Sequence, residues 1–415
     1  MLALVGRMGV ARAEIAVPGA DGSDGEFSPG ANVTIDLGQA KTAPWNSPSS
    51  GGLGVYDPNK WAVVFKYTSV NIPSGVSVAY NNNSSRAPVV WLVSGDVMIN
   101  GALILNGANG AANPFFAEPG PGGFRGGNAT VNFSQVGTAG FGPGGGLLVF
   151  RPWDDPYNRA MNGSYGTKGT SASGNQGGIY GNAQIVPLIG GSGGAGTHDD
   201  GNRGGEGGGG GGGAILIVAR GTISVNGGIY ADGGTGAGWA AGGSGGAIRL
   251  VSDRLLGGGR LEASGGGTCC NQYLNGGLGR IRLEANVYDG SHSLMPRTIV
   301  TKPNNPILIW PPSSAPTIRI LSVGGTPLGT DPTGRFSVAG ADITIPSAGP
   351  AEIVAESRNL PPNSTVVLRM TRAQNQAIIV SMTPVDGATA DLAQWKATVE
   401  VPTDFAALQV RAVSP

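Results

Sequence analysis

Short runs of β-branched and other apolar residues return along the chain at a constant interval. Gly213-Ala-Ile-Leu-Ile-Val, Gly246-Ala-Ile-Arg-Leu-Val and Gly279-Arg-Ile-Arg-Leu-Glu begin 33 residues apart. Runs of this length and composition favour β-strands. A constant period of this size is typical of stacked repeats, in which one unit cannot bury its apolar face alone and successive units cover each other.

A second short run follows the first in each repeat. It reads Asn226-Gly-Gly-Ile-Tyr-Ala-Asp-Gly-Gly in one copy and Gly258-Gly-Arg-Leu-Glu-Ala-Ser-Gly-Gly in the next. The same pair of runs occurs upstream, where Val89-Val-Trp-Leu-Val-Ser precedes Asn100-Gly-Ala-Leu-Ile-Leu-Asn-Gly. Each unit is therefore two strands, a turn and a closing glycine tract. We predict an all-β fold in which residues 87–288 form a glycine-rich, right-handed β-solenoid.

Residues 14–86 precede the repeats and contain further strand candidates. Two of them are residues 32–37 and residues 61–67, and residues 70–78 read as a strand, a Pro-Ser-Gly turn and a second strand. The open end of a stack would leave strand edges and apolar surface uncovered. We therefore expect residues 14–86 to supply the first turns and the cap of the solenoid.

Glycine is concentrated in the middle of the chain, since 57 of the 76 glycines lie between residues 101 and 290. Residues 111–212 interrupt the repeat as a long insertion, and its glycine tracts resist assignment to helix or strand. Gly207–Gly213 is a run of seven glycines directly before a strong strand candidate. Glycine permits positive φ and close approach of backbones, so we expect tight corners and stacked extended chains here. The alternative is a lattice of polyglycine helices, whose crowded contacts only glycine fits.

Proline becomes frequent in residues 289–316, which we expect to form an extended linker. Beyond it, short apolar runs alternate with turn signals at nearly regular spacing, without the glycine bias. This pattern is typical of an antiparallel β-sandwich, and we predict an immunoglobulin-like β-sandwich for residues 317–415, with Trp395 in its core. Its predicted strands are residues 317–323, 341–346, 351–356, 364–371, 376–384, 395–402 and 406–413.

Charge and cysteine content exclude several classes of function. Lys plus Arg and Asp plus Glu number 26 each, so there is no basic field for nucleic acid and no acidic field for a basic partner. The two cysteines, Cys269 and Cys270, are adjacent and do not form a disulfide framework. Two idle thiols in a turn are the main interpretation, with an intermolecular link or a metal site as alternatives.

The first residues resemble the end of a signal peptide. Ala11-Arg-Ala13 has the small-x-small form of a cleavage site, and a polar stretch rich in Gly, Asp and Ser follows it. Residues 1–13 are therefore interpreted as a signal-peptide remnant, which predicts a secreted or cell-surface protein. No stretch of the sequence reaches the ~18 apolar residues that span a bilayer, and we expect no membrane span.

The repeats resemble the glycine-rich β-solenoid regions of large bacterial secreted and cell-surface proteins. In those regions short Ile, Leu and Val strands alternate with Asn-Gly turns and with glycine tracts of the kind found here at Gly242-Gly-Ser-Gly-Gly-Ala-Ile-Arg-Leu250. The resemblance covers residues 61–288, and residues 317–415 look like the accessory domains of exported proteins. It implies an architecture and carries over no catalytic residue.

Catalysis on polysaccharides by a β-helix requires two or more carboxylates on one face, ~5–10 Å apart, so that one acts as acid and another as base or nucleophile. Asp-Asp pairs beside glycine and proline are more often turn residues that cap backbone donors. We favour that structural interpretation over a catalytic one. The catalytic candidates all lie in the insertion and are Asp154, Asp155, Asp199, Asp200 and Glu206.

Aromatic residues are frequent in the insertion, and half or more of them are expected to anchor it to the flank of the solenoid. The remainder is a candidate stacking surface for a carbohydrate. His198 and His292 are the histidines of the sequence, so we expect no metal site of the usual kinds and no cofactor. The candidate ligand-binding residues are Trp153, Tyr157, Tyr165 and His198.

These observations favour a non-enzymatic, exported structural or adhesive protein that binds a polysaccharide or another matrix component through the insertion. A polysaccharide lyase or glycoside hydrolase of the β-helix type is the first alternative, and a receptor-binding fibre component is the second. The enzyme needs its carboxylates clustered on adjacent units, whereas the adhesin needs only an exposed aromatic or polar patch. The insertion is the expected site because its residues are not obliged to fill the solenoid core.

Overall fold

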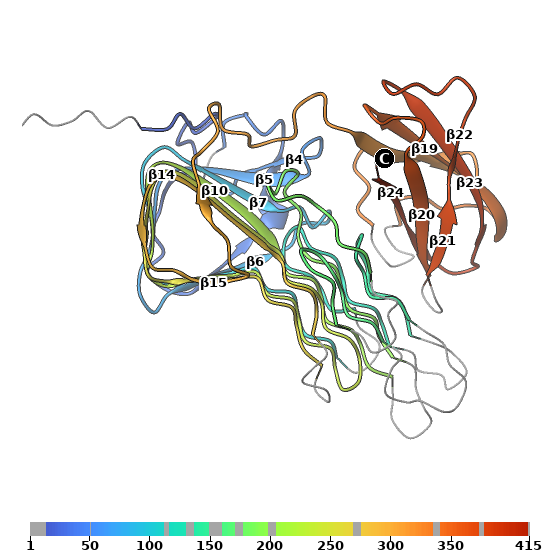
Figure 1. The fold of residues 1–415 in the computed structure, drawn as a ribbon, viewed down its shortest axis with the longest axis horizontal. Coiled ribbons are helices and arrows are strands. Elements are labelled where there is room, and N and C mark those ends of the chain that lie inside the picture. Colours follow the sequence, from blue (N-terminus) through green and yellow to red (C-terminus); the bar gives the residue numbers. More distant parts are fainter. Residues whose placement is uncertain are drawn as a thin grey trace, which may run out of the picture.

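The fold is nearly all β, with 40% of residues in strands and 1% helical, which confirms the predicted class. The strands that the structure describes form four sheets, named A to D below, which divide into a mainly parallel part and an antiparallel part (Figure 1). The computed structural model describes residues 14–49, 51–111, 116–129, 137–148, 160–170, 177–197, 205–268, 275–334, 341–372 and 377–413.

Sheet A is the larger sheet of the parallel part, and its central order is β14, β12, β10, β7 and β5, all parallel. Among the described residues it contains β1 (Gly25–Phe27), β3 (Lys41–Thr42), β4 (Val55–Asp57), β5 (Ala62–Ile72), β7 (Val89–Val93), β8 (Val97–Ile99), β10 (Ala214–Val225), β12 (Ala247–Gly257), β14 (Arg280–Gly290) and β16 (Val300–Thr301).

Sheet B lies opposite sheet A, and the chain visits the two sheets in alternation. Strand β10 in sheet A is followed by β11 in sheet B, and in the same way β13 follows β12 and β15 follows β14. A short 3-10 helix, η1 (Leu37–Gln39), follows the first strand of sheet B. The described strands of sheet B are β2 (Val33–Asp36), β6 (Ser77–Asn81), β9 (Ala102–Ile104), β11 (Gly228–Tyr230), β13 (Arg260–Glu262) and β15 (Ser293–Met295).

Equivalent residues of successive units lie side by side. Ile215 in β10 pairs with Ile248 in β12, which pairs with Ile281 in β14, 33 residues further on each time. In sheet B, Ile229 pairs in the same way with Leu261. These side chains belong to one buried cluster shared by the two sheets. Parallel strands that fill such a core read as continuous apolar runs, which is why the period is visible in the sequence.

The insertion does not separate the units that flank it. Val89 in β7 pairs directly with Ile215 in β10, although their positions in the sequence are 126 residues apart. Leu103 in β9 pairs with Ile229 in β11 across the same interval. The stack is therefore continuous, and the insertion leaves it and returns within one unit.

The glycine-rich segments of the insertion and of the repeats pack against each other as extended chains outside the four sheets. In Figure 1 they run side by side away from the sheets, as turquoise, green and yellow traces. We call this region the glycine lattice. Its described segments are residues 105–111, 116–128, 137–147, 160–170, 177–197, 205–213, 231–246, 263–267 and 276–279.

Gly207–Gly213 lies in the middle of the lattice, and its N–H groups donate to three neighbouring chains in turn. Every third N–H, beginning with that of Gly207, donates to a carbonyl in residues 105–111. The N–H groups one position later donate to residues 124–127, and those two positions later donate to residues 241–244. A period of three without internal hydrogen bonds is the geometry of the polyproline II helix. The glycine tracts therefore adopt the polyglycine lattice that the sequence offered as an alternative.

Only glycine fits in this central chain. A Cβ at Gly209 would overlap the carbonyl oxygen of Gly234, and one at Gly211 would overlap that of Gly191. Each position from 208 to 213 meets backbone atoms in this way. Because neighbouring chains surround this part of the run on every side, no position from 208 to 213 can direct a side chain into free space. This accounts for six of the seven consecutive glycines.

Residues 289–316 do not form the extended linker expected from their prolines, so that prediction is wrong. Strand β14 continues to Gly290, and β15 and β16 add further strands to both sheets. Ile307 and Ile309 are buried on the outer face of sheet A, where Trp310 meets Trp45 edge-on with 5.4 Å between ring centroids. The apolar residues between the prolines give this segment a surface to bury, and it folds back onto the sheet.

Residues 317–413 contain two antiparallel sheets that share one apolar cluster, which includes Trp395 as expected. The described strands agree with six of the seven predicted ranges. Residues 341–346 form no strand, because Ile343 and Ile345 pack on the cluster without pairing. We call the two sheets the C-terminal sheet pair. Sheet C contains β17 (Thr317–Val323), β18 (Thr326–Pro327), β19 (Gly349–Arg358), β22 (Thr383–Pro384) and β23 (Ala393–Val401), and sheet D contains β20 (Thr365–Arg372), β21 (Ile378–Ser381) and β24 (Ala406–Val413).

Candidate functional site

Most residues that the sequence singled out lie outside the described residues, and their proposed roles stay predictions. Two candidates of the insertion are described, Glu206 and Tyr165. Outside the described residues are Asp154, Asp155, Asp199, Asp200, Trp153, Tyr157, His198, Cys269 and Cys270.

Glu206 closes a turn of the glycine lattice. Its carboxylate accepts a hydrogen bond from the backbone N–H of Trp239, and its own N–H donates to Oγ1 of Thr197 at 3.0 Å. Gly238, beside this carboxylate, has a φ of +42°, which glycine adopts without the steric cost of a Cβ. The carboxylate thus caps a backbone donor in a turn that requires a positive φ, and these contacts give it a structural role.

Tyr165 is fully buried and cannot stack on a carbohydrate at the surface, contrary to the expectation. Its ring centroid lies 4.6 Å from that of Tyr180, and the guanidinium of Arg280 lies over the ring at 5.4 Å. Together with Ile185 and Leu188, these rings pack on the outer face of sheet A. Burial raises the pKa of the Tyr165 hydroxyl. The ring anchors the insertion to the sheet, as predicted for part of its aromatic residues.

Arg369 joins the C-terminal sheet pair to the glycine lattice. From β20 its guanidinium donates to the carbonyl oxygens of Gly140 at 2.7 Å, Gly142 at 3.1 Å and Gly145 at 3.2 Å. The residue is only 9% exposed, and burial lowers the pKa of the guanidinium to about 10. A guanidinium carries five N–H donors in a fixed fork. It therefore supplies hydrogen-bond donors to lattice carbonyls at the border where the lattice meets the C-terminal sheet pair and not another glycine chain.

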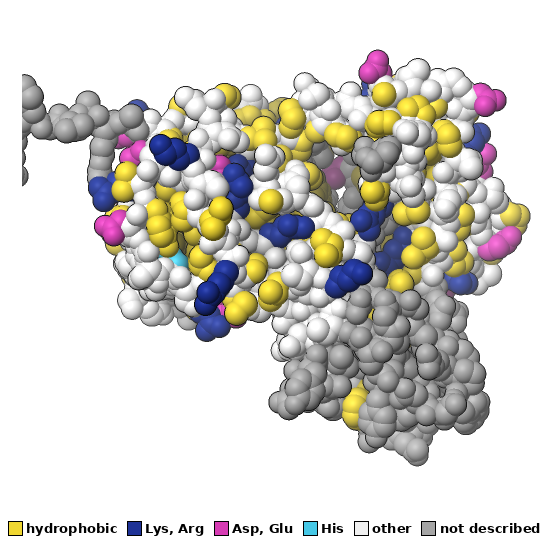
Figure 2. Space-filling model, in the orientation of Figure 1, with side chains coloured by type: hydrophobic (Ala, Val, Ile, Leu, Met, Phe, Trp, Pro, Cys, Tyr) yellow, Lys and Arg dark blue, Asp and Glu magenta, His cyan; other side chains and the backbone are white. Residues whose placement is uncertain are grey.

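Further polar contacts fix the sheet pair against the rest of the molecule. Arg411 in β24 donates to the carbonyl oxygen of Ile179 at 3.1 Å, and the hydroxyl of Tyr56 donates to Oδ1 of Asp331 at 2.7 Å. Figure 2 shows Lys and Arg side chains standing singly among hydrophobic and uncharged ones on this face of the molecule. Each of these two contacts is a single hydrogen bond between one donor and one acceptor.

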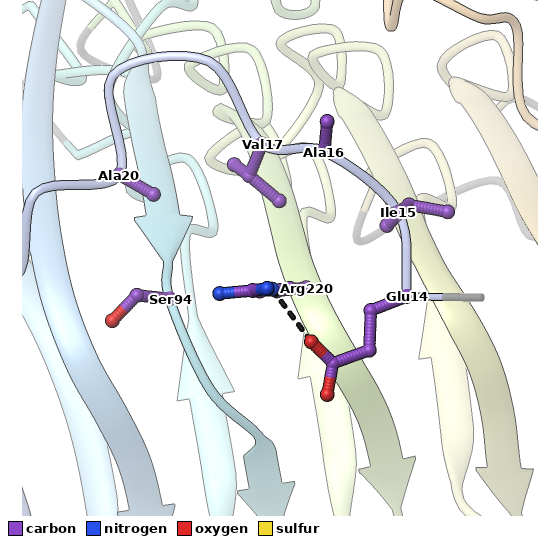
Figure 3. A pocket seen from close by; sticks show the side chains of 7 residues that line it. All are labelled: Glu14, Ile15, Ala16, Val17, Ala20, Ser94 and Arg220. Carbon is purple, nitrogen blue, oxygen red and sulfur yellow. Dashed lines mark ion pairs between the residues drawn. The ribbon is translucent and has the colours of Figure 1, made fainter. Parts of the chain in front are cut away.

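A cavity of about 320 Å³ lies on the outer face of sheet A, beneath the segment Glu14–Ala20 (Figure 3). The Arg220 side chain reaches along it from β10, with Nε 2.6 Å from Oε2 of Glu14. Ile15 and Val17 supply part of its apolar wall. Both charged side chains are about half exposed, so solvent screens their attraction. One screened ion pair on an apolar wall is a weak basis for a binding site.

A more polar group of side chains lies on the outer face of sheet B. In β13 the central residue Leu261 is buried in the core, so the neighbouring Arg260 and Glu262 lie on the opposite face. Nε of Arg260 lies 2.7 Å from Oε2 of Glu262, and the hydroxyl of Ser264 donates to Oε1 of Glu262 at 2.9 Å. Both carboxylate oxygens of Glu262 are therefore held in place.

Asp232 lies next to this ion pair on the preceding unit. Its Oδ1 accepts a hydrogen bond from the N–H of Ser264 at 2.7 Å, and its own N–H donates to Oδ1 of Asn106 at 2.8 Å. Partial burial, and to a smaller extent the Glu262 carboxylate, raise the pKa of Asp232 to about 6, against the opposing effects of the Ser264 hydrogen bond and of Arg260. A carboxyl group with this pKa can take up and release a proton near neutral pH.

The sequence analysis missed Asp232 and Glu262 because it looked for carboxylates in the insertion. A signal was available in the two similar runs that begin at Asn226 and Gly258. Once these runs are aligned, Tyr230 corresponds to Glu262 and Asp232 to Ser264, which is the register of sheet B. Acidic residues two positions apart on neighbouring units then lie on the same face.

Comparison of the chain with family models, with curated proteins and with solved structures finds no match in any of the three. In the described part of the chain, no helix is long and apolar enough to cross a membrane. The same residues include no group of three or more His, Cys, Asp or Glu side chains placed to hold a metal ion.

Proposed function

We propose that this is an exported structural or adhesive protein that binds a glycan or another matrix polymer. The observation that carries the proposal is the glycine lattice, in which backbone chains touch on every side of Gly207–Gly213. Close-packed interiors have low compressibility and transmit strain. Such a body suits a mechanical task, which is to hold a binding surface rigidly with respect to the sheets and the C-terminal sheet pair.

The proposal includes a β-solenoid formed by sheets A and B and an immunoglobulin-like fold for the C-terminal sheet pair. The alternation of the chain between the two parallel sheets supports the first, since stacked repeats bury a shared core in this way. The antiparallel pairing of sheets C and D around Trp395 supports the second. Both are common supports for binding surfaces, which makes them compatible with an adhesive role.

The adhesive function can be tested by sedimentation of the full chain with insoluble cellulose, chitin and peptidoglycan. We expect saturable binding to at least one of the three. A matched variant, Gly209→Val, introduces a side chain at a position that backbone atoms surround, and we expect it to bind less. A folded wild-type protein that sediments with none of the polymers would contradict adhesion.

Export can be tested separately by expressing the natural gene, with any coding sequence that precedes residue 1, in a bacterium and sequencing the N-terminus of the protein recovered outside the cytoplasm. Cleavage after Ala13 predicts a mature chain that begins with Glu14. Recovery of the whole protein from the cytoplasm with residues 1–13 attached would contradict export.

A polysaccharide-cleaving enzyme is the second candidate function, and Asp232 and Glu262 are the observation that favours it. They lie on one face of neighbouring units, and a pKa of about 6 suits a general acid near neutral pH. The test is release of new chain ends from soluble polysaccharides. Activity that is lost in both Asp232→Asn and Glu262→Gln would establish the enzyme, and no release by the wild-type protein would contradict it.

A further inference from the structure

Tyr230 lies across its own strand on the outer face of sheet B. In β11 the central residue Ile229 is buried in the core, so Gly228 and Tyr230 lie on the outer face. The Cε2, Cζ and Oη atoms of Tyr230 occupy the place that a Cβ of residue 228 would take. The ring therefore folds back over Gly228 and covers it. The side chain of Tyr230 is partly exposed.

The polar group described above borders this ring. In the register of sheet B, Tyr230 stands beside Glu262, and Gly228 stands beside Arg260. Neighbouring strands of a sheet lie ~4.8 Å apart, so the ion pair of Arg260 and Glu262 lies on the strand directly beside the ring. The Arg260 side chain is 55% exposed, whereas that of Glu262 is 15% exposed. Asp232, two residues after Tyr230, extends the polar border.

An aromatic face with carboxylate and guanidinium groups at its edge matches the chemistry of a sugar ring. The apolar C–H face of a pyranose packs on the aromatic ring, while the hydroxyl groups at its edge exchange hydrogen bonds with the charged side chains. Here Tyr230 supplies the platform, Glu262 and Asp232 supply acceptors, and Arg260 supplies donors. These polar side chains are held by Ser264 and by each other, so little ordering is required when a ligand binds.

The charge of the group narrows the class of sugar. Two carboxylates and one guanidinium leave a net negative charge once Asp232 is ionised, which repels uronates and sulfated sugars. A platform on a flat sheet also favours a sugar whose ring hydroxyls are equatorial, because such a ring is flat on both faces. Among neutral polymers of such sugars, β-1,4-linked chains also extend as flat ribbons, so a neutral β-linked hexose polymer fits a flat face best.

We propose that Tyr230, Asp232, Arg260 and Glu262 form a subsite for a neutral β-linked glycan on the outer face of sheet B. The inference rests on the proposed adhesive function and places binding on the repeat, outside the insertion. Tyr230 lies two residues after Gly228 in β11, and the residue between them, Ile229, points into the core. The repeat therefore combines a structural inner face with an outer face that is free to recognise a ligand.

The test is isothermal titration of the full chain with cellohexaose and with N-acetylchitohexaose, and with oligogalacturonate as the acidic probe. We expect at least one neutral hexamer to bind, with a Kd on the order of 0.1–1 mM. Tyr230→Ala should weaken binding ~10-fold or more, and Arg260→Ala several-fold, whereas Tyr230→Phe should keep most of it. Tyr288→Ala is the matched control, because Tyr288 is an exposed tyrosine of sheet A, and it should bind as the wild type does.

Each outcome bears on the subsite or on the adhesive function separately. If Tyr230→Ala and Arg260→Ala both unfold at the wild-type temperature and bind as the wild type does, the subsite is wrong and adhesion stands. The same holds if the wild-type protein sediments with a polymer but binds neither hexamer. Failure in both assays overturns both proposals. Tighter binding of oligogalacturonate than of either neutral hexamer overturns the assignment to a neutral glycan.

Discussion

The glycine lattice and the C-terminal sheet pair touch each other, yet they are ordered by opposite means. In the sheet pair, large side chains fill the interior, and Trp395 is 1% exposed with its indole N–H donating to Oγ of Ser357 at 2.8 Å. In the lattice, backbone groups make the contacts, and the positions from 208 to 213 have no space for a Cβ. Removing atoms should therefore damage the sheet pair, whereas adding atoms should damage the lattice.

Removal of the largest buried side chain of the C-terminal sheet pair should have the largest effect. Trp395→Ala deletes an indole from the centre of the C-terminal sheet pair and leaves Ser357 without its donor. We expect the free energy of unfolding of the sheet pair to fall by about 4 kcal/mol, since Trp→Ala in a core combines lost transfer energy with a cavity. Urea unfolding followed by circular dichroism measures it. A loss below ~1 kcal/mol would show that the side chains of this cluster do not determine its order.

Addition of one methyl group to the lattice should be nearly as damaging. Gly209→Ala places a Cβ against the carbonyl of Gly234, and we expect a loss of about 3 kcal/mol because backbone on every side cannot give way. The control is Gly329→Ala in residues 317–413, where no heavy atom lies within 4 Å of the new Cβ. It should change stability by less than ~0.5 kcal/mol in the same urea titration. Equal effects of the two changes would contradict the close-packed lattice.

The contact between the two regions should rank third. Arg369→Met removes the donors of three lattice carbonyls, and we expect a loss of about 2 kcal/mol, with the sheet pair and the lattice unfolding in separate transitions. Differential scanning calorimetry distinguishes one transition from two. Arg358→Met is the control, because this exposed arginine pairs with Glu356 at 3.5 Å in solvent, and its loss should cost less than ~0.5 kcal/mol. A single unshifted transition for Arg369→Met would show that the two regions are not coupled through this residue.

The smallest expected effect concerns a side chain at the edge of the lattice. The pKa of Asp232 is about 6, above its ordinary value of 3.8, so the folded state binds more protons than the unfolded state between these values. The stability that this group contributes is present below about pH 4 and is lost as pH rises through about 6. Asp232→Asn should be more stable than the wild type at pH 7 by about 1 kcal/mol, reduced by solvent screening, and equal to it at pH 4.

Thermal unfolding at pH 4 and pH 7 measures this difference. Asparagine suits the site, because Asn106 accepts the corresponding hydrogen bond in the neighbouring unit. A variant whose advantage is the same at both pH values would show that protonation of Asp232 is not its cause.

Strand positions could be predicted wherever an apolar run fills a core. The runs at Val89 and Gly213 give β7 and β10, and the ranges 317–323 and 406–413 give β17 and β24 without error. Residues 289–316 were predicted wrongly, because proline content was weighed above the apolar residues between the prolines. Whether such a segment stays free depends on a surface far away in sequence, here the outer face of sheet A.

The lattice and the sheet B face were harder to predict for different reasons. A glycine tract is compatible with tight turns or with packed polyglycine helices. Which of the two forms depends on how many other segments of the chain pack around the tract, and the sequence does not give that number. The run of seven glycines was the usable signal, since only a surrounded chain requires glycine at each position. Asp232 and Glu262 were missed because the repeat strands were interpreted only as filling the core. Every second residue of a strand faces outward, and these outward positions were not considered as a site.

The three-way bonding of the lattice has a consequence for how this molecule looks in solution. A sheet is cross-linked along one direction perpendicular to its strands, whereas Gly207–Gly213 is cross-linked along three. Far-ultraviolet spectroscopy assigns chains without helical or ladder bonds to the unordered fraction. Their amide hydrogens should nevertheless exchange with deuterium as slowly as those of β10. A segment that one technique counts as coil can therefore be among the last parts of the molecule that a protease enters.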